Sequence, residues 1–331
     1  MSELRWNPVL EEWVITATER QERTFLPPKD YCPLCPTRPG AAFPTEVPLP
    51  DYELVAFENR FPALRREPPA PAIEPQGLYR VQPAQGVCEV LLYTSQHEGT
   101  LTDRSVREIE HLIQMWTDRT LELGALEYVK YVMIFENKGT VIGVTLTHPH
   151  GQLYAFPFIP PKLQKELDSS RAHHERTGRC LFCGILAQER EDGRRIIWET
   201  DTWLAMIPFY ARWPYEVHLL PKRHCLALAD LSLAERGELA LALKAVLLKY
   251  DNLWQLSMPY MMAVHQAPTD GQDHSYYHLH IEFYPPHRTR DKLKYLASVE
   301  TSAGTFINDT LPEEKAAELR AVVPQRIEDV H

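Results

Sequence analysis

The sequence predicts an α+β fold of two tandem units, in which helices pack on antiparallel sheet. Two observations lead to this prediction. Both halves of the chain carry a Cys-x-x-Cys pair, then a lone histidine, then a His-x-His, in the same order and at similar spacings. Both halves also show strand-like runs on either side of one long helical pattern. Such a repeat indicates two copies of one supersecondary unit, which we place at residues 1–160 and 161–331.

The first unit opens with a proline-rich stretch between residues 26 and 85, which we expect to form an extended, packed wrap. A helix is expected to begin at Thr102-Asp103, because apolar residues such as Ile109 and Trp116 then share one stripe. Runs rich in aliphatic and aromatic residues predict strands at 87–93, 128–135 and 152–158.

The second unit repeats this order after an expected linker helix at 161–179. A long helix is expected from about residue 232 to 250, and residues 288–331 are expected to form a closing tail. Strands are predicted near 202–207, 215–220, 259–265 and 278–284.

Composition excludes several classes of protein. A hydrophobic content of 44% and a charged content of 24% are typical of a soluble globular enzyme. The net charge of −10, with no basic stripe, argues against nucleic acid as a partner. No apolar run approaches the ~20 residues of a membrane span, and the N-terminal residues do not resemble a signal peptide. We therefore expect a cytoplasmic protein that binds neither nucleic acid nor membrane.

The repeated cysteines and histidines have the composition of zinc sites, because zinc favours four tetrahedral Cys and His ligands. The predicted ligands of the first site are Cys32, Cys35, His97 and His148. Those of the second site are Cys180, Cys183, His224 and His278. Each set leaves no open coordination position, so we expect two structural Zn²⁺ ions per chain. The second histidine of the first His-x-His, His150, stays available for chemistry.

The segments 135–139 (FENKG) and 148–152 (HPHGQ) closely resemble the galactose-1-phosphate uridylyltransferase family of the histidine-triad superfamily. The similarity covers nearly the whole chain. It implies two histidine-triad-like units and transfer of UMP between UDP-glucose and galactose 1-phosphate, by a ping-pong mechanism, in galactose metabolism. It also implies that the partners are UDP-glucose, UDP-galactose and hexose 1-phosphates, and that the protein is a homodimer with shared active sites.

Within this motif His150 is the predicted nucleophile, because a neutral imidazole is nucleophilic near pH 7 without a base. Its other ring N–H needs an acceptor, which we expect to be a backbone carbonyl near Asn137. On a strand, the side chains of His148, His150 and Gln152 share one face. In the family the glutamine donates its amide to an oxygen of the α-phosphate, so Gln152 is the second predicted catalytic residue.

The resemblance implies further substrate contacts. Arg20 and Arg23 match the phosphate-binding arginines of the family, and guanidinium suits bidentate phosphate binding. Asn59 and Phe61 resemble its uridine-contacting turn. The remaining substrate-binding candidates are Asn137, Gly143, Thr145, Lys294 and Glu300. The last two align with a tail segment that in the family reaches the hexose and phosphate from the partner subunit.

The sequence of the second half does not decide which of two sets of residues binds a metal ion. Some family members bind iron there through one glutamate and three histidines. The matching positions here are Glu166, His265, His280 and Glu282, so a carboxylate replaces one histidine. We favour zinc at the cysteine-containing site. The second half also lacks the Pro-His-Gly-Gln signature, so we expect His280, the counterpart of His150, to be structural.

Other functions on the same fold stay open, because the preference for base and sugar rests on the resemblance alone. One is adenylyl transfer or phosphorolysis with ADP-glucose or a dinucleoside polyphosphate. Another is hydrolysis, against which Gln152 argues, since hydrolases of this group typically have a second histidine there that protonates the leaving group. The alternative that is not an enzyme is a nucleotide-binding scaffold protein stabilised by zinc. Such a protein would need no exposed nucleophile.

Overall fold

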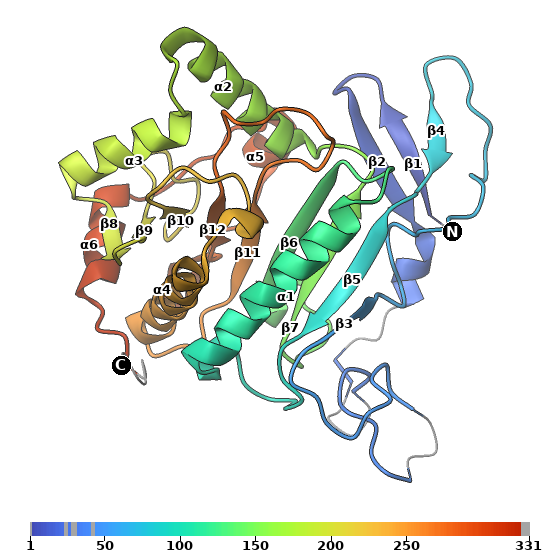
Figure 1. The fold of residues 1–331 in the computed structure, drawn as a ribbon, viewed down its shortest axis with the longest axis horizontal. Helices are drawn as coiled ribbons and strands as arrows, with labels where there is room; N and C mark the ends of the chain where they lie inside the picture. The colour runs from blue at the N-terminus through green and yellow to red at the C-terminus, as the bar shows by residue number, and fades with distance from the viewer. Residues whose placement is uncertain (1, 23–25, 28–31, 41–43, 326–331) are drawn as a thin grey trace.

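The computed structural model describes residues 2–22, 26–27, 32–40 and 44–325. Its centre is one nine-stranded sheet in the order β3-β5-β7-β6-β11-β12-β10-β9-β8, antiparallel at every pairing (Figure 1). The strands of the first half are β3 (Val55–Glu58), β5 (Val87–Leu92), β6 (Tyr131–Lys138) and β7 (His150–Phe156). Those of the second half are β8 (Ile196–Glu199), β9 (Trp203–Met206), β10 (Val217–Pro221), β11 (Tyr260–His265) and β12 (His280–Tyr284).

The order of the strands confirms the repeat seen in the sequence. From the centre outward, the first half runs β6, β7, β5, β3 and the second half runs β11, β12, β10, β9. The two halves join where β6 pairs with β11, with Ile134 opposite Val264 and Lys138 opposite Tyr260. The predicted α+β architecture is therefore confirmed, and the two units share one sheet.

Helices α1 (Val106–Gly124) and α4 (Leu233–Leu253) lie side by side on one face of this sheet (Figure 1). Each begins with the same capping box, in which a serine N-cap and a glutamate three residues later satisfy each other's backbone N–H groups. The pairs are Ser105 with Glu108 and Ser232 with Glu235. The expected start at Thr102-Asp103 was wrong, because Leu101–Asp103 forms a separate 3₁₀ turn before the cap.

A continuous apolar core fills the space between the helices and the sheet. Ile109, Ile113 and Trp116 of α1 are buried there, as the stripe predicted, and they belong to the same cluster as Leu243 of α4. Val264 of β11 is part of that cluster too. One core thus spans both halves, so burial of apolar surface in one half depends on the other.

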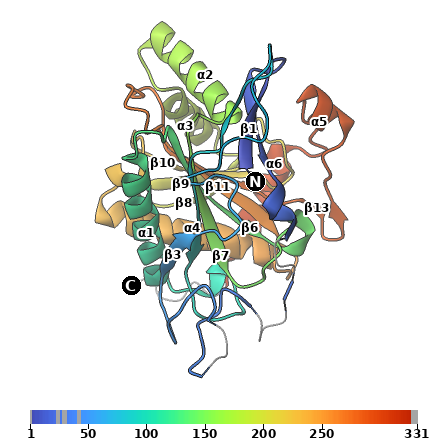
Figure 2. The same cartoon turned by 90° about the vertical axis from the view of Figure 1, so that its right-hand side faces the viewer.

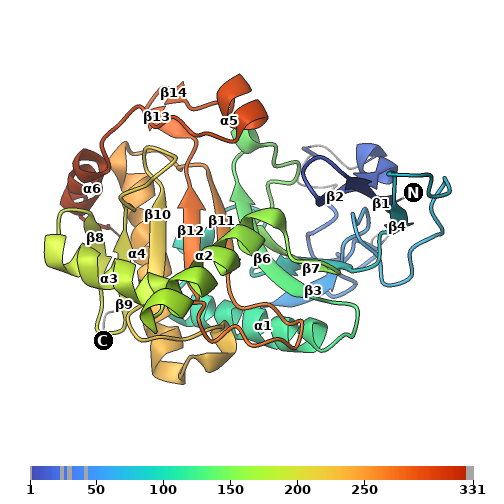
Figure 3. The same ribbon diagram turned by 90° about the horizontal axis from the view of Figure 1, so that it is seen from above.

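The other elements surround the central sheet. Helices α2 (Pro161–Thr177) and α3 (Leu181–Asp192) lie at one end of it, at the top of Figure 2. A three-stranded sheet of β1 (Ser2–Asn7), β2 (Glu12–Ala17) and β4 (Val81–Pro83) lies at the far right in Figure 3. The tail contains β13 (His287–Thr289), β14 (Lys292–Leu293), α5 (Ser298–Ala303) and α6 (Pro312–Ala321). In the described part of the chain, none of the helices has the length and apolarity to cross a bilayer.

Strand β6 carries a buried carboxyl group, that of Glu136. Its Oε1 accepts hydrogen bonds from the hydroxyls of Tyr93 at 3.2 Å and Tyr260 at 2.7 Å. Its Oε2 has no hydrogen-bond partner among the described residues. Burial raises the pKa of Glu136 to about 7.

Between the ordinary carboxyl pKa of 4.5 and about 7, the unfolded chain ionises Glu136 while the folded protein keeps it protonated, so stability falls as the pH rises through this range. We therefore predict that Glu136→Gln matches the wild type in stability at pH 4.5. At pH 8 the variant should be more stable than the wild type by roughly 3 kcal/mol. Chemical denaturation of both proteins across this range checks the prediction, and a difference that does not change with pH contradicts it.

Candidate active site and metal centres

The segment between β6 and β7 builds the centre of the site. After β6 the chain makes a 3₁₀ turn (Thr140–Ile142) that ends at Gly143 with φ of +85°, a conformation glycine adopts without strain. Strand β7 begins at His150, which pairs with Leu92 of β5. His148 therefore precedes the strand, whereas we expected from the sequence that His148 and His150 both lie on it.

The ring of His150 is fixed by the backbone beside it. Its Nδ1–H donates to the carbonyl oxygen of His148 at 2.8 Å. The expected acceptor near Asn137 was therefore wrong, because the entry into β7 brings the carbonyl two residues earlier under the ring. Burial lowers the pKa of His150, so the ring is neutral near pH 7. Nε2 is then left with a lone pair for an electrophile.

A pocket lies beside His150. It is lined by four of the predicted residues besides His150, namely Asn59, Phe61, Thr145 and Gln152. Gln152 shares the His150 face of β7, as the two-residue period requires. The turn after β3 is held by Asn59, whose Oδ1 accepts the Phe61 N–H at 2.9 Å.

His150 also lines a second pocket. Its wall includes Asn137 at the end of β6 and the turn after that strand. A reactive ring that lines two pockets can contact a group bound in either one. This arrangement suits a transfer reaction, in which two parts of a substrate lie on either side of the attacking atom.

Of the predicted arginines, Arg20 contacts the turn formed by Asn59 and Phe61. Its guanidinium donates to the Tyr154 hydroxyl at 3.0 Å and to the Phe61 carbonyl at 3.4 Å. Arg23 lies outside the described residues. In the tail, Lys294 and Glu300 form an ion pair at 3.3 Å within the one chain.

The first predicted metal centre has the geometry of a tetrahedral site. The ligand atoms of Cys32, Cys35, His97 and His148 lie within 4.8 Å of one another. Cys35 Sγ is 3.4 Å from His97 Nδ1 and 3.5 Å from His148 Nδ1. Zn–S and Zn–N bonds of about 2.3 and 2.1 Å at a tetrahedral angle put such atoms about 3.6 Å apart. The four residues therefore fit zinc.

The second predicted centre repeats this geometry. Cys183 Sγ is 3.5 Å from His278 Nδ1 and 3.6 Å from His224 Nδ1, and Cys180 completes the set. Cys183 lies on α3, a helix that the sequence analysis did not predict. The residues fit zinc here as well.

Backbone carbonyls orient the buried ligand histidine of each centre in the same way. His148 Nε2–H donates to the carbonyl of Thr94 at 2.8 Å, and His278 Nε2–H donates to that of Pro221 at 3.1 Å. Each bond fixes the tautomer whose Nδ1 lone pair points at the cysteines. The Thr94 carbonyl could not be predicted as the acceptor, because it reaches the His148 ring only through tertiary folding and no sequence pattern indicates it.

A third cluster contains Glu166, His265, His280 and Glu282, whose ligand atoms also lie within 4.8 Å of one another. It is separate from the second cysteine site, so the two arrangements considered for this half are not alternatives. The resemblance implies iron at this cluster in some members. The ammonium of Lys162, however, hydrogen-bonds Glu282 and lies 3.6 Å from Glu166 Oε1. The positive charge of this ammonium beside both carboxylates disfavours an added divalent ion there.

The tandem sheet, with a fixed imidazole beside a Cys/His cluster, defines the class of histidine-triad-like proteins. Within that class, the chain belongs to the galactose-1-phosphate uridylyltransferase family. Residues 1–160 match the family model described as galactose-1-phosphate uridyl transferase, N-terminal domain. Residues 166–331 match the model of the corresponding C-terminal domain.

Individual relatives agree with this assignment. The chain is 46% identical to a galactose-1-phosphate uridylyltransferase of Thermotoga maritima, over 97% of this chain and 98% of the relative. It is 36% identical to the enzyme of that name from Rattus norvegicus, over 97% and 88%. A solved uridylyltransferase structure superposes with a TM-score of 0.85 at 36% identity, covering 96% of this chain and 97% of the other.

We predict that Cys32→Ser and Cys180→Ser each lose one equivalent of zinc and several kcal/mol of stability, since a metal that binds only the folded state stabilises it. Metal analysis and thermal unfolding of the purified proteins check this. Cys88→Ser, at a buried thiol outside all three clusters, is the matched control and should keep its zinc. Full zinc content in Cys32→Ser contradicts the assignment of the first centre.

Proposed function

We propose that this protein transfers UMP from UDP-glucose to galactose 1-phosphate through a covalent uridylyl-histidine at His150. Family membership supports the reaction, because the relatives that align over nearly the whole chain are galactose-1-phosphate uridylyltransferases. The observation that carries the mechanism is the 2.8 Å bond from His150 Nδ1 to the carbonyl of His148. It leaves a neutral Nε2 free to attack in the wall of two pockets.

In the first half-reaction, Nε2 of His150 forms a bond to the α-phosphorus while the bond to the oxygen of glucose 1-phosphate breaks. In the second, a phosphate oxygen of galactose 1-phosphate attacks the same phosphorus, UDP-galactose forms and the imidazole leaves. Each half-reaction exchanges one P–N and one P–O bond, so no water is consumed. The ring stays a good leaving group because its Nδ1–H donates to a neutral carbonyl and not to a carboxylate.

Gln152 and the turn at Asn59 are proposed to hold the substrate. The Gln152 amide lines the same pocket as His150 and is suited to donate to a non-bridging oxygen of the α-phosphate. Asn59 and Phe61 would contact the uridine, with Arg20 and Arg23 near the phosphates. Asn137, Gly143 and Thr145 complete the proposed set, and Gly143 and Thr145 come from the segment between β6 and β7.

We propose that zinc occupies the two cysteine-containing centres and has a structural role. At the first centre, a Zn²⁺ ion held by Cys32, Cys35, His97 and His148 would fix the backbone whose carbonyl orients His150. The chemistry itself rests on the imidazole. Reduced thiols and bound zinc suit the cytoplasm, which we propose as the compartment.

We also propose a homodimer in which the tail completes the partner's site. The tail carries exposed apolar side chains beside the ion pair of Lys294 and Glu300, with Tyr295 at 74% and Leu296 at 49% exposure. Such side chains are typical of an interface. In the dimer, Lys294 and Glu300 would contact the hexose phosphate of the neighbouring subunit.

The second candidate is adenylyl transfer or phosphorolysis with ADP-glucose. A solved ADP-glucose phosphorylase from Arabidopsis thaliana superposes with a TM-score of 0.72 at 24% identity, a likeness of fold alone. The curated relatives with at least 30% identity favour the uridylyl reaction.

We predict that mixing the protein with UDP-glucose alone, followed by a rapid quench, gives an acid-labile UMP adduct in an intact mass spectrum. His150→Gly should fold, keep its zinc and form no adduct. His174→Ala, at an exposed histidine of α2, is the control and should form the adduct normally. An adduct from ADP-glucose instead, or nucleotide release without any adduct, contradicts the proposed reaction.

Gln152→Ala should lower the rate of adduct formation by about 10² to 10³, the usual effect of removing one donor to a developing oxyanion. The zinc content and the thermal midpoint should stay near those of the wild type. Quenched-flow measurement at saturating UDP-glucose gives the rate, and an unchanged rate excludes Gln152 from transition-state stabilisation.

A further inference from the structure

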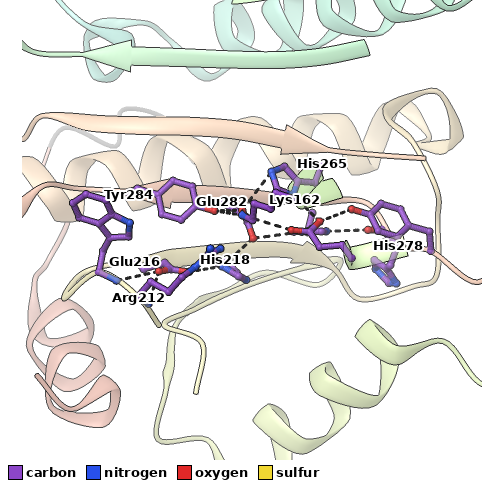
Figure 4. A network of polar contacts seen from close by, with 12 residues as sticks. Lys162, Arg212, Glu216, His218, His265, His278, Glu282 and Tyr284 are labelled. Carbon is purple, nitrogen blue, oxygen red and sulfur yellow. Dashed lines mark hydrogen bonds and ion pairs between the residues drawn. The ribbon is translucent and has the colours of Figure 1, made fainter. Parts of the chain in front are cut away.

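The third cluster in the second half contains a positive charge of its own. Lys162 is the second residue of α2, and its ammonium donates hydrogen bonds to the Glu282 carboxylate and the Tyr284 hydroxyl (Figure 4). It also lies 3.6 Å from Oε1 of Glu166. One ammonium therefore contacts both carboxylates of the cluster.

Three other members of the cluster, His265, His280 and Glu282, are buried, and Glu166 is partly buried. His265 joins the two carboxylates, with Nδ1 3.0 Å from Glu166 and Nε2 3.3 Å from Glu282. His218 lies 3.3 Å from Glu282 on its other side (Figure 4). Nε2 of His280 has no hydrogen-bond partner among the residues that the structure describes. Two carboxylates in such a site need a cation, because an uncompensated buried charge is very costly.

We infer that the Lys162 ammonium is the cation of this cluster and takes the place of a metal ion. It neutralises one negative charge where the two carboxylates face each other, and Glu282 is only 3% exposed. A divalent ion bound by Glu166 and Glu282 would lie within a few ångströms of the ammonium and be repelled by it. The two carboxylates of the cluster thus have a cation without a metal ion.

The position of Lys162 in its helix supports this inference independently. A cation in the first turn of a helix is unfavourable, because the N-terminus carries a partial positive charge. Lys162 lies there, next to Pro161 at the start of α2. Its ion pair with Glu282 offsets that cost and ties α2 to strand β12.

The test compares wild type, Lys162→Met and Lys165→Met, each loaded with zinc and then titrated with Co²⁺. Methionine keeps the length of the side chain and removes the charge, and Lys165 is an exposed lysine of the same helix. Lys162→Met should bind one additional Co²⁺ per chain, with an absorption spectrum that lacks thiolate-to-cobalt charge transfer. The wild type and Lys165→Met should bind none.

Stability gives a second readout. Without Co²⁺, the thermal midpoint of Lys162→Met should fall below that of Lys165→Met, and Co²⁺ should restore it. Lys162→Arg, which keeps the charge, should gain no metal. If Lys162→Met does not fold, Lys162→Gln takes its place. The inference is overturned if the wild type binds the additional Co²⁺, or if the folded neutral variant binds none.

This result is separable from the proposed function, because Lys162 belongs to neither pocket beside His150 in the described structure. Lys162→Met should still form the UMP adduct when mixed with UDP-glucose. Loss of the adduct in the wild type would therefore count against the reaction and leave the role of Lys162 untouched.

Discussion

The site depends on the backbone between His148 and His150. His148 faces the cysteines through Nδ1, is held by the Thr94 carbonyl through Nε2, and offers its own carbonyl to the ring of His150. The same peptide segment thus carries a predicted metal ligand and the proposed nucleophile. A displacement of the His148 carbonyl would therefore move the hydrogen-bond acceptor of the His150 ring.

The second half repeats the backbone geometry found at His150. His280 Nδ1–H donates to the carbonyl of His278 at 3.0 Å, as His150 does to that of His148. His280 is 1% exposed, however, and its neighbours are carboxylates instead of a pocket. His150 and His280 therefore differ in access and in surrounding charge, although Nδ1 of each ring has an equivalent carbonyl acceptor.

Much of the site could be predicted because it is encoded locally. The Cys-x-x-Cys and His-x-His spacings indicated both metal centres, and the period of two residues put Gln152 on the His150 face. The acceptor for His150, the Thr94 carbonyl and the place of Lys162 could not be predicted, because each depends on where separate segments meet. Helix α3 was missed because its apolar positions do not form a clear stripe.

The pairing of β6 with β11 has a consequence for how such a chain can evolve. Strand β6 is eight residues long, and β11 covers its outer edge over Tyr260 to Val264. If the second half were deleted, that edge would be open to pairing with other chains and would invite aggregation. The second half therefore acts as a permanently attached cover for the edge of β6, and selection for solubility would preserve it whatever the role of its own histidines.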